Sequence, residues 1–262
     1  MANANSHSKL HSRDGRTVAT IQVRMGSTRC PGKVLQEVRG RPLLGYLIQR
    51  LQQCSTIDEI VVATSTRPEN NEIERFCNQN RINCFRGSEE DVLGRMLGAL
   101  ESRSAQFGVE VYGDGPLIDP SIVDHAVSYF KRHPEYDFVG NDLYTSYPPG
   151  MEVEVFSISA LKDSNKRTSD PNIREHGTLF LRTHPELYRL KNLLAPTDLR
   201  RPDLELEVDT PEDLELITFI LNQFGDQVDF SLAQIIELLD SNERMRSINQ
   251  HVVRRWKEFR QD

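Results

Sequence analysis

The chain has 262 residues, and its 39 acidic against 32 basic side chains give a formal net charge of -7 at pH 7. This balance disfavours a general nucleic-acid binder, because such proteins neutralise many phosphates over a broad basic face. No apolar run approaches the roughly 18 residues that span a bilayer. We therefore expect one large or two small α/β domains in the cytoplasm, with no nucleic-acid or membrane partner.

The N-terminal residues and the cysteines narrow the class further. Residues 1–16 are polar, without the hydrophobic stretch of a signal peptide, and they predict a flexible tail outside the fold. The cysteines show neither a CxxC pair nor the spacing of metal ligands, which disfavours a zinc site or a disulfide framework. We expect reduced thiols at Cys30, Cys54, Cys77 and Cys84.

Strands and helices alternate along the first half of the chain. Residues 18–23 and 59–64 are β-rich runs typical of strands buried on both faces, and between them residues 43–51 repeat leucine and isoleucine at helical spacing. The pattern predicts a doubly wound, mainly parallel α/β sheet with ligands beyond the carboxyl ends of its strands. Further elements are expected at 69–80 (helix), 82–85 (strand), 89–102 (helix), 109–112 (strand) and 120–132 (helix).

The second half is less regular. Residues 141–194 mix prolines, turn signals and short alternating runs, and we expect an inserted arm that pairs with a second subunit in a homodimer. A strand at 204–208 and a helix at 211–224 follow. We expect one main domain over 17–225 and a helical C-terminal appendage over 226–262.

A loop rich in glycine and positive charge follows the first strand. The cations Arg24, Arg29 and Lys33 stand among two glycines and a proline. Backbone N–H groups of such a turn cradle phosphate oxygens, and Arg or Lys adds charge-assisted hydrogen bonds. The spacing of the glycines and Val34 after the lysine disfavour a Walker A loop, and the absence of GxGxxG disfavours a dinucleotide site. A solvated loop remains the alternative to a polyphosphate site.

Two aspartates at strand ends have no evident structural role. Asp114 lies in "GDGPLIDP" and Asp209 in "LEVDTPEDLELI", where the neighbouring residues already supply helix caps. Oxygen ligands of this kind suit a divalent metal, although a turn-forming aspartate is the alternative. Ser88 has the spacing of a capping box with Asp91, which accounts for it without a ligand, and Arg95 lies two turns into the same helix.

The motifs together resemble a known family. "QVRMGSTRCPGKVL", "FRGSEEDVL", "GDGPLIDP", "EVEVFS", "REH" and "VDTPEDLELI", in this order, resemble the cytidylyltransferases of the spore-coat polysaccharide type, relatives of CMP-Kdo and CMP-sialic acid synthetases. The resemblance implies a Rossmann-like nucleotidyltransferase fold and an enzyme that uses CTP and Mg²⁺ to transfer CMP to a small acceptor, releasing pyrophosphate.

The same resemblance implies a role for individual residues. It makes Arg24 and Lys33 the catalytic cations at the triphosphate, and it makes Asp114 and Asp209 the metal ligands. The implied nucleotide-binding residues are Met25, Gly26, Ser27, Arg29, Lys33, Ser88 and Arg95, and the implied acceptor-binding residues are Glu152, Glu175 and His176.

The chain departs from the family pattern near the acceptor. Relatives usually carry an arginine and a threonine where this chain has Glu110 and Tyr112, a cysteine in place of Gly115, and an aspartate in place of Glu152. The acceptor therefore stays open between a sugar, a sugar acid and a phosphorylated or phosphonate compound. The alternatives in function are a nucleotidyltransferase for another nucleoside triphosphate and a non-catalytic nucleotide-binding protein of the same fold.

Overall fold

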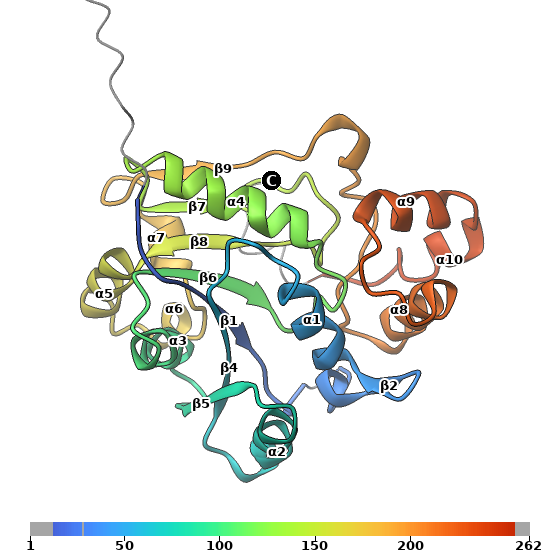
Figure 1. Ribbon diagram of the computed structural model, residues 1–262, viewed down its shortest axis with the longest axis horizontal. Helices are drawn as coiled ribbons and strands as arrows, with labels where there is room; N and C mark the ends of the chain where they lie inside the picture. The colour runs from blue at the N-terminus through green and yellow to red at the C-terminus, as the bar shows by residue number, and fades with distance from the viewer. Residues whose placement is uncertain (1–12, 28, 255–262) are drawn as a thin grey trace, which may run out of the picture.

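A seven-stranded sheet forms the centre of the molecule (Figure 1), in the order β5-β4-β1-β6-β8-β7-β9. The computed structural model describes residues 13–27 and 29–254. Only β8 runs antiparallel to its neighbours, β6 and β7, so the expected mainly parallel sheet is confirmed. The strands are β1 (Thr17–Gln22), β4 (Glu59–Ser65), β5 (Asn83–Gly87), β6 (Phe107–Tyr112), β7 (Phe138–Gly140), β8 (Glu154–Ser157) and β9 (Leu190–Asn192).

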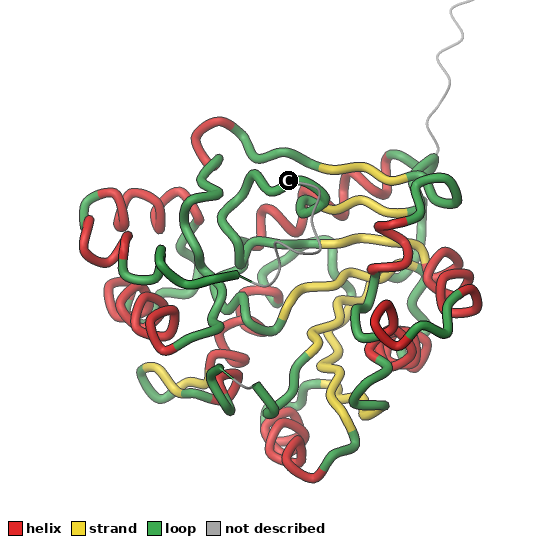
Figure 2. Tube along the Cα trace, turned by 180° about the vertical axis from the view of Figure 1, so that it is seen from behind, coloured by secondary structure: helices red, strands yellow, loops and turns green. Residues whose placement is uncertain are grey.

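Helices cover both faces of this sheet, as the alternating pattern predicts. The apolar side chains of α1 (Leu43–Leu51), α2 (Asn71–Gln79) and α4 (Pro120–Arg132) pack into one core on one face. Those of α3 (Val92–Ser102), α5 (Ile158–Arg167) and α7 (Leu179–Thr183) pack into a second core on the other face. Figure 2 shows the same sheet from behind. The remaining short elements are β2 (Glu37–Val38), β3 (Arg41–Pro42), α6 (Pro171–Arg174), and 3-10 turns at Lys33–Leu35, Pro68–Asn70 and Thr197–Leu199.

Local capping signals fix where two helices begin. Asp119 accepts a hydrogen bond from the backbone of Ser121 at the start of α4, and Thr210 and Asp213 form the capping box of α8 (Pro211–Phe224). The capping box expected at Ser88 forms only in part: the Ser88 hydroxyl accepts from the backbone N–H of Asp91 at 3.1 Å, but Ser88 is not the N-cap. Asp91 is the N-cap of α3 and accepts from Gly94, so this helix begins at Val92 rather than at residue 89.

Residues 141–194 are built into the main sheet, so the expected inserted arm is wrong. They supply β8, between β6 and β7, and the edge strand β9 beside β7. Helices α5, α6 and α7 connect these two strands. The sequence pattern does not predict this order, because β8 also pairs with β6, from which α4 and β7 separate it in the chain, and no local signal encodes such a pairing.

Of the helical appendage expected over 226–262, the structure describes residues 226–254, which carry two helices and share the main core; residues 255–262 lie outside the described residues. Helix α9 (Leu232–Asp240) buries Ile235 and Leu239 in the same cluster as α1 and α4, and α10 (Glu243–Ser247) follows it. The strand expected at 204–208 is wrong. That run is itself a loop. The backbone N–H of Leu206 donates to the carbonyl oxygen of Pro149 at 2.7 Å, and that of Val208 donates to the carbonyl oxygen of Asp114 at 2.8 Å.

The expected flexible tail falls largely outside the described residues, which begin at 13. Residues 13–16 contact the domain: the Arg13 guanidinium lies 4.5 Å from the centre of the Phe130 ring. Within the part of the chain that the structure describes, no helix has the length and apolarity needed to cross a bilayer.

Candidate active site

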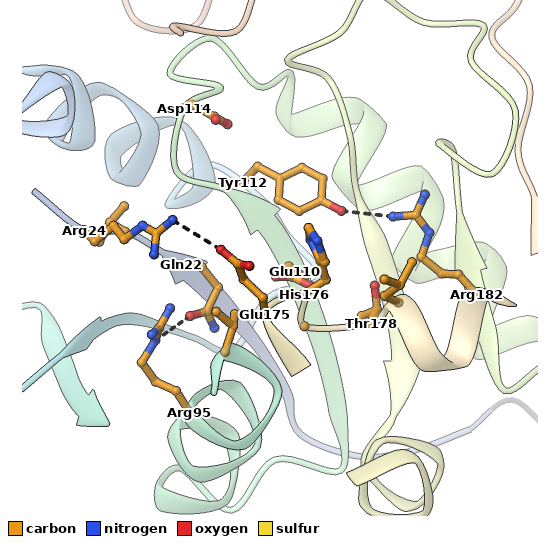
Figure 3. A pocket seen from close by; sticks show the side chains of 14 residues that line it. Gln22, Arg24, Arg95, Glu110, Tyr112, Asp114, Glu175, His176, Thr178 and Arg182 are labelled. Carbon is orange, nitrogen blue, oxygen red and sulfur yellow. Dashed lines mark hydrogen bonds and ion pairs between the residues drawn. The ribbon is translucent and has the colours of Figure 1, made fainter. Parts of the chain in front are cut away.

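Two adjoining cavities lie beyond the carboxyl ends of β1 and β6, where the fold predicts a ligand. Their volumes are about 310 and 340 Å³, and they share Gln22, Val23, Arg24, Tyr112 and Asp114. The first, which we call the upper cavity, is further lined by Val92, Arg95, Glu110, Glu175, His176, Gly177, Thr178, Leu179 and Arg182 (Figure 3). The second, the loop cavity, is further lined by Gly26, Ser27, Arg29, Lys33, Val34, Gly113 and Asp209.

Close backbone packing sets the position of Asp114 between the two cavities. A Cβ atom on Gly113 would lie 2.6 Å from the carbonyl oxygen of Gln22, and one on Gly115 would lie 2.7 Å from that of Gly150. Only glycine fits at both positions, because real Cβ atoms do not approach a backbone oxygen so closely. The two glycines thus hold the turn that carries Asp114 against the end of β1.

Lys33 joins the two aspartates that the sequence predicts as metal ligands. Its Nζ atom donates to Asp114 Oδ2 at 3.3 Å and to Asp209 Oδ1 at 2.9 Å, and it also bonds the carbonyl oxygen of Val208. Arg29 Nη2 donates to Asp209 Oδ2 at 2.6 Å. The loop after β1 therefore places Lys33 against both carboxylates and Arg29 against Asp209.

The neighbouring carboxylates keep Lys33 protonated. Burial alone would lower the pKa of Lys33, but Asp114 and Asp209 outweigh that effect and raise the pKa above the ordinary value. Burial raises the pKa of the nearby Glu207 carboxyl well above its ordinary range, and the charges of Asp114, Glu152 and Asp209 raise it further. This acidic surrounding favours a cation between the two aspartates.

The other cations of the site face the upper cavity. Arg24 forms ion pairs with Glu89 at 3.2 Å and Glu175 at 3.8 Å. Arg95 is 4% exposed, and its Nε atom donates to Gln22 Oε1 at 3.0 Å. This side chain is therefore part of the cavity wall and is not solvated (Figure 3).

Several residues expected at the site make hydrogen bonds to neighbouring parts of the protein. The backbone N–H of Met25 donates to Asn70 Oδ1 at 2.8 Å, and that of Ser27 donates to the carbonyl oxygen of Met25. The carbonyl oxygen of Ser88 accepts from Arg95 at 2.5 Å. Glu152 Oε2 accepts from the backbone of Gly150 at 2.7 Å, and neither Met25, Ser88 nor Glu152 is among the residues that line the two cavities.

Glu175 and His176, expected on the acceptor side, line the upper cavity opposite Arg24. They follow α6 and precede α7. Burial lowers the pKa of His176 below its ordinary value, with Arg182 adding to the effect and Glu175 opposing it. A neutral imidazole at physiological pH is able to accept a proton.

A buried polar cluster in the wall of the upper cavity was not predicted. Arg182 Nη1 lies 3.0 Å from Glu154 Oε1 and 3.2 Å from Asp142 Oδ2, and the Tyr112 hydroxyl donates to Glu154 at 3.0 Å. Thr178 also bonds Glu154. Glu110 lies beside them beneath Gly177, where an added Cβ atom would lie 2.7 Å from Glu110 Oε2.

The signal for this cluster was present but weak. Arg182 stands in an apolar helix next to Phe180 and Leu181, and a buried arginine requires carboxylate partners. The partners come from β8 and from the loop after β7, and only the pairing of distant strands reveals which carboxylates they are.

Replacing Glu110 by Gln is expected to stabilise the protein at alkaline pH. Burial raises the pKa of Glu110 from 4.5 to about 7, with Asp142 adding to the effect and Arg182 opposing it. In the unfolded chain this carboxyl ionises first, so the folded state loses stability as pH rises from the unfolded to the folded pKa. The difference corresponds to about 3 kcal/mol above pH 7.

Urea unfolding at pH 5 and pH 8 measures this effect. The stabilisation by Glu110→Gln is expected to be much larger at pH 8 than at pH 5. If Glu110→Gln changed the free energy of unfolding equally at pH 5 and pH 8, burial would not raise the pKa of the Glu110 carboxyl.

The fold and the site define the class of protein. A cationic loop after β1, two aspartates at neighbouring loops and cavities beyond the strand ends are the features of a nucleotide-binding α/β enzyme. The family model described as "Cytidylyltransferase" matches residues 18–251, and the chain belongs to this family. It is a CTP-dependent nucleotidyltransferase, which transfers CMP to a small acceptor and releases pyrophosphate.

Known proteins agree with this assignment. The chain is 35% identical over 228 residues to the spore coat polysaccharide biosynthesis protein SpsF of Bacillus subtilis, covering 85% of this chain and 93% of that protein. A cytidylyltransferase structure from Leptospira borgpetersenii superposes with a TM-score of 0.85 at 28% identity, covering 91% of this chain and 99% of the other. A CMP:2-keto-3-deoxy-manno-octonic acid synthetase in complex with CTP has a TM-score of 0.62 at 18% identity, covering 79% and 99%, and shares the fold.

Proposed function

We propose that the loop cavity binds the triphosphate of CTP and that the upper cavity binds the acceptor. The observation that carries this proposal is the convergence of Lys33 and Arg29 on Asp114 and Asp209 at the carboxyl ends of the strands. A tetraanionic triphosphate is neutralised by cationic side chains and a divalent metal, and the presence of two cations beside two carboxylates supports this proposal.

In the proposed reaction, an acceptor oxygen attacks the α-phosphorus of CTP in line with the departing pyrophosphate. The protein mainly positions the two reactants and neutralises charge. Lys33 and Arg24 stabilise the negative charge that grows on the leaving pyrophosphate. Arg95, in the wall beside Gln22, is the proposed contact of the nucleoside where the upper cavity adjoins the loop cavity.

Asp114 and Asp209 are the proposed ligands of Mg²⁺. Their carboxylates already meet at one cation, the Lys33 ammonium, so the donor set fits a divalent ion. Among the described residues, no group of three or more His, Cys, Asp or Glu side chains is arranged to hold a metal. Two carboxylates suffice, because Mg²⁺ usually completes its shell with substrate phosphates and water. The bound ion would supply polarisation of the α-phosphate.

On the acceptor side, Glu175 and His176 are the proposed contacts, with neutral His176 in position to take a proton from an acceptor hydroxyl. Glu152 lies outside the cavity lining, and we propose that it supports the Gly150 turn against Gly115. The similarity to SpsF supports an acceptor used in polysaccharide biosynthesis, in the cytoplasm, where the chain's free thiols stay reduced.

A homodimer is part of the proposal. Tyr144, Leu187 and Leu194 expose 49%, 44% and 60% of their surface on the segment once expected to form an arm. An apolar patch marks an interface, and we propose that these three side chains contact the second subunit. Sedimentation equilibrium is expected to give a mass near twice 30.0 kDa. A monomer at micromolar concentration would contradict the dimer.

CTP with Mg²⁺ is expected to raise the melting temperature more than ATP, GTP or UTP at equal concentration. Selective binding to the folded state stabilises it in proportion to affinity, and the family assignment specifies cytosine. Differential scanning fluorimetry with the four nucleotides measures the shifts. Equal shifts would favour the alternative of another nucleoside triphosphate.

A further inference from the structure

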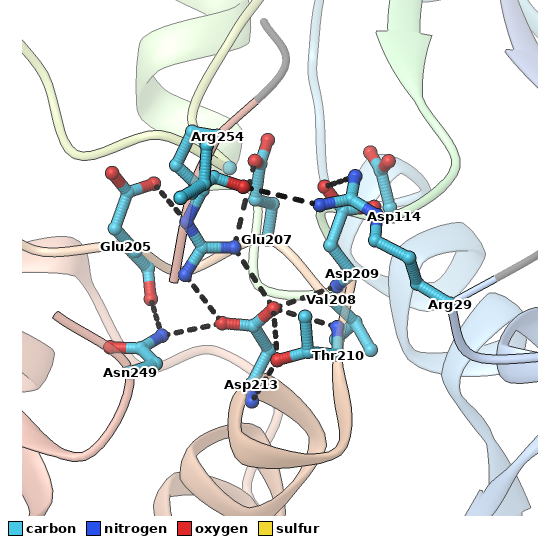
Figure 4. Close-up of polar contacts among 12 residues, drawn as sticks. Arg29, Asp114, Glu205, Glu207, Val208, Asp209, Thr210, Asp213, Asn249 and Arg254 are labelled. Atoms are coloured by element: carbon cyan, nitrogen blue, oxygen red, sulfur yellow. Dashed lines mark hydrogen bonds and ion pairs between the residues drawn. The ribbon is translucent and has the colours of Figure 1, made fainter. Parts of the chain in front are cut away.

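The segment after α10 returns to the loop cavity beside Asp209, the proposed metal ligand, and buries an arginine there. The Arg254 guanidinium is bidentate to Asp213, with Nη2 to Oδ1 at 2.6 Å and Nη1 to Oδ2 at 2.9 Å (Figure 4). Its side chain is 1% exposed, and its Nε and Nη1 atoms lie 3.5 Å from Glu205 and 3.9 Å from Glu207. Asp213 thus compensates the buried charge, with Glu205 and Glu207 beside it.

Asp213 connects this arginine to the backbone of Asp209. Its Oδ2 atom accepts from the N–H of Asp209 at 2.9 Å and from that of Thr210 at 2.8 Å. Asn249 donates to Asp213 Oδ1 at 2.7 Å and to the carbonyl oxygen of Glu205 at 3.0 Å. Burial alone would raise the pKa of Asp213, but the bonds from Arg254 and Asn249 lower it, so this carboxylate stays ionised.

A second connection runs to the side chain of Asp209. The carbonyl oxygen of Val253 accepts from Arg29 Nη1 at 3.4 Å, and Nη2 of the same guanidinium donates to Asp209 Oδ2 at 2.6 Å. The segment that carries Arg254 therefore reaches both the backbone and the carboxylate of Asp209 (Figure 4).

Capping of α8 does not account for the contacts of Arg254. The capping box of α8 needs only Thr210 and Asp213, which bond each other's backbone. Burying a guanidinium beside that box carries a desolvation cost that apolar packing would avoid. A role in fixing the geometry of Asp209 explains why a charged, planar group lies at this position.

We propose that Arg254 is a positioning residue for Asp209: its bidentate pair with Asp213 fixes the Asp209 backbone, and the adjoining Val253 carbonyl fixes Arg29 against the carboxylate. This inference rests on the proposed function, in which Asp209 is a metal ligand. The consequence is that loss of Arg254 weakens metal binding without removing any atom that touches the metal.

The test uses Mn²⁺ as a probe. At saturating CTP, water-proton relaxation measures the affinity of the full-length protein for Mn²⁺. Arg254→Ala is expected to weaken this affinity about tenfold, the scale on which residues that orient metal ligands act. Arg254→Lys is expected to recover only part of it, because an ammonium cannot replace the planar two-bond contact.

Arg201→Ala is the matched control. Arg201 is also bidentate, to Asp203, with Nε to Oδ1 and Nη2 to Oδ2 both at 3.0 Å, and its Nη1 atom bonds Asp240, but it has no bond to Asp209 or Asp213 among the described residues. This variant is expected to lower the melting temperature while the Mn²⁺ affinity stays at the wild-type value. The comparison separates lost stability from lost positioning.

A double-variant cycle identifies the route. Asp213→Asn keeps the size of the side chain but loses the charged pair, so adding Arg254→Ala to it is expected to weaken Mn²⁺ binding little further. Wild-type Mn²⁺ affinity in Arg254→Ala would overturn the positioning role alone. Failure of the wild-type CTP complex to bind Mn²⁺ would instead overturn the proposed metal site.

Discussion

Asp114→Asn and Asp209→Asn are each expected to lower the turnover number for pyrophosphate release by more than about a hundredfold, a loss at least as large as that of one preorganised charge-stabilising group. An amide keeps the size of the carboxylate but loses its charge, so it binds a divalent cation poorly. Both side chains point into the cavities rather than into the core. The chain is therefore expected to fold.

Steady-state kinetics and circular dichroism measure the two parts of this prediction. Asp226→Asn is the control, because the Asp226 side chain is 97% exposed and pairs only with Arg39 among the described residues. It is expected to keep wild-type turnover. Near-wild-type activity in Asp114→Asn or Asp209→Asn would remove that residue from the metal site.

Lys33→Ala is expected to reduce turnover by about a hundredfold, because the charge that Lys33 stabilises grows in the transition state. Lys33→Arg is expected to restore only part of the activity, since a planar guanidinium does not replace a compact ammonium between two carboxylates. A surface lysine would change stability by less than about 0.5 kcal/mol. Here the side chain is 11% exposed and paired with both aspartates, so Lys33→Ala is also expected to lower the melting temperature.

The response to Mg²⁺ sharpens this prediction. In the wild type, a divalent cation competes with the Lys33 ammonium for Asp114 and Asp209. In Lys33→Ala the two carboxylates repel each other, so Mg²⁺ alone is expected to raise the melting temperature of the variant more than that of the wild type. An unchanged turnover number in Lys33→Ala would remove the lysine from the site.

The parts of the fold that follow from local signals were predictable. Helices α4 and α8 have the expected bounds. They begin where expected because Asp119-Pro120 and Thr210-Pro211 are start signals that need no distant partner. The parallel strands β1 and β4 are apolar runs typical of strands buried on both faces, wherever they lie in the sheet.

The errors fall where distant residues decide the structure. β8 lies between β6 and β7 because its backbone pairs with both, and the run at 204–208 bonds to the Pro149 and Asp114 loops instead of to a strand. At the site, sequence motifs grouped the cations and aspartates, but the contacts of Lys33 with both carboxylates depend on three separate loops. The burial of Arg182 and Arg254 depends likewise on partners from other elements.

The most direct test of CMP transfer is pyrophosphate release by the wild-type protein with Mg²⁺ and a panel of sugars, sugar acids and phosphorylated or phosphonate acceptors, with each of the four nucleoside triphosphates in turn. We expect release with CTP and at least one acceptor, together with a CMP-linked product detected by mass spectrometry, and no comparable release in Asp209→Asn. Release that is equal with UTP, GTP or ATP, or no release with any acceptor by a protein that binds CTP, would contradict the account.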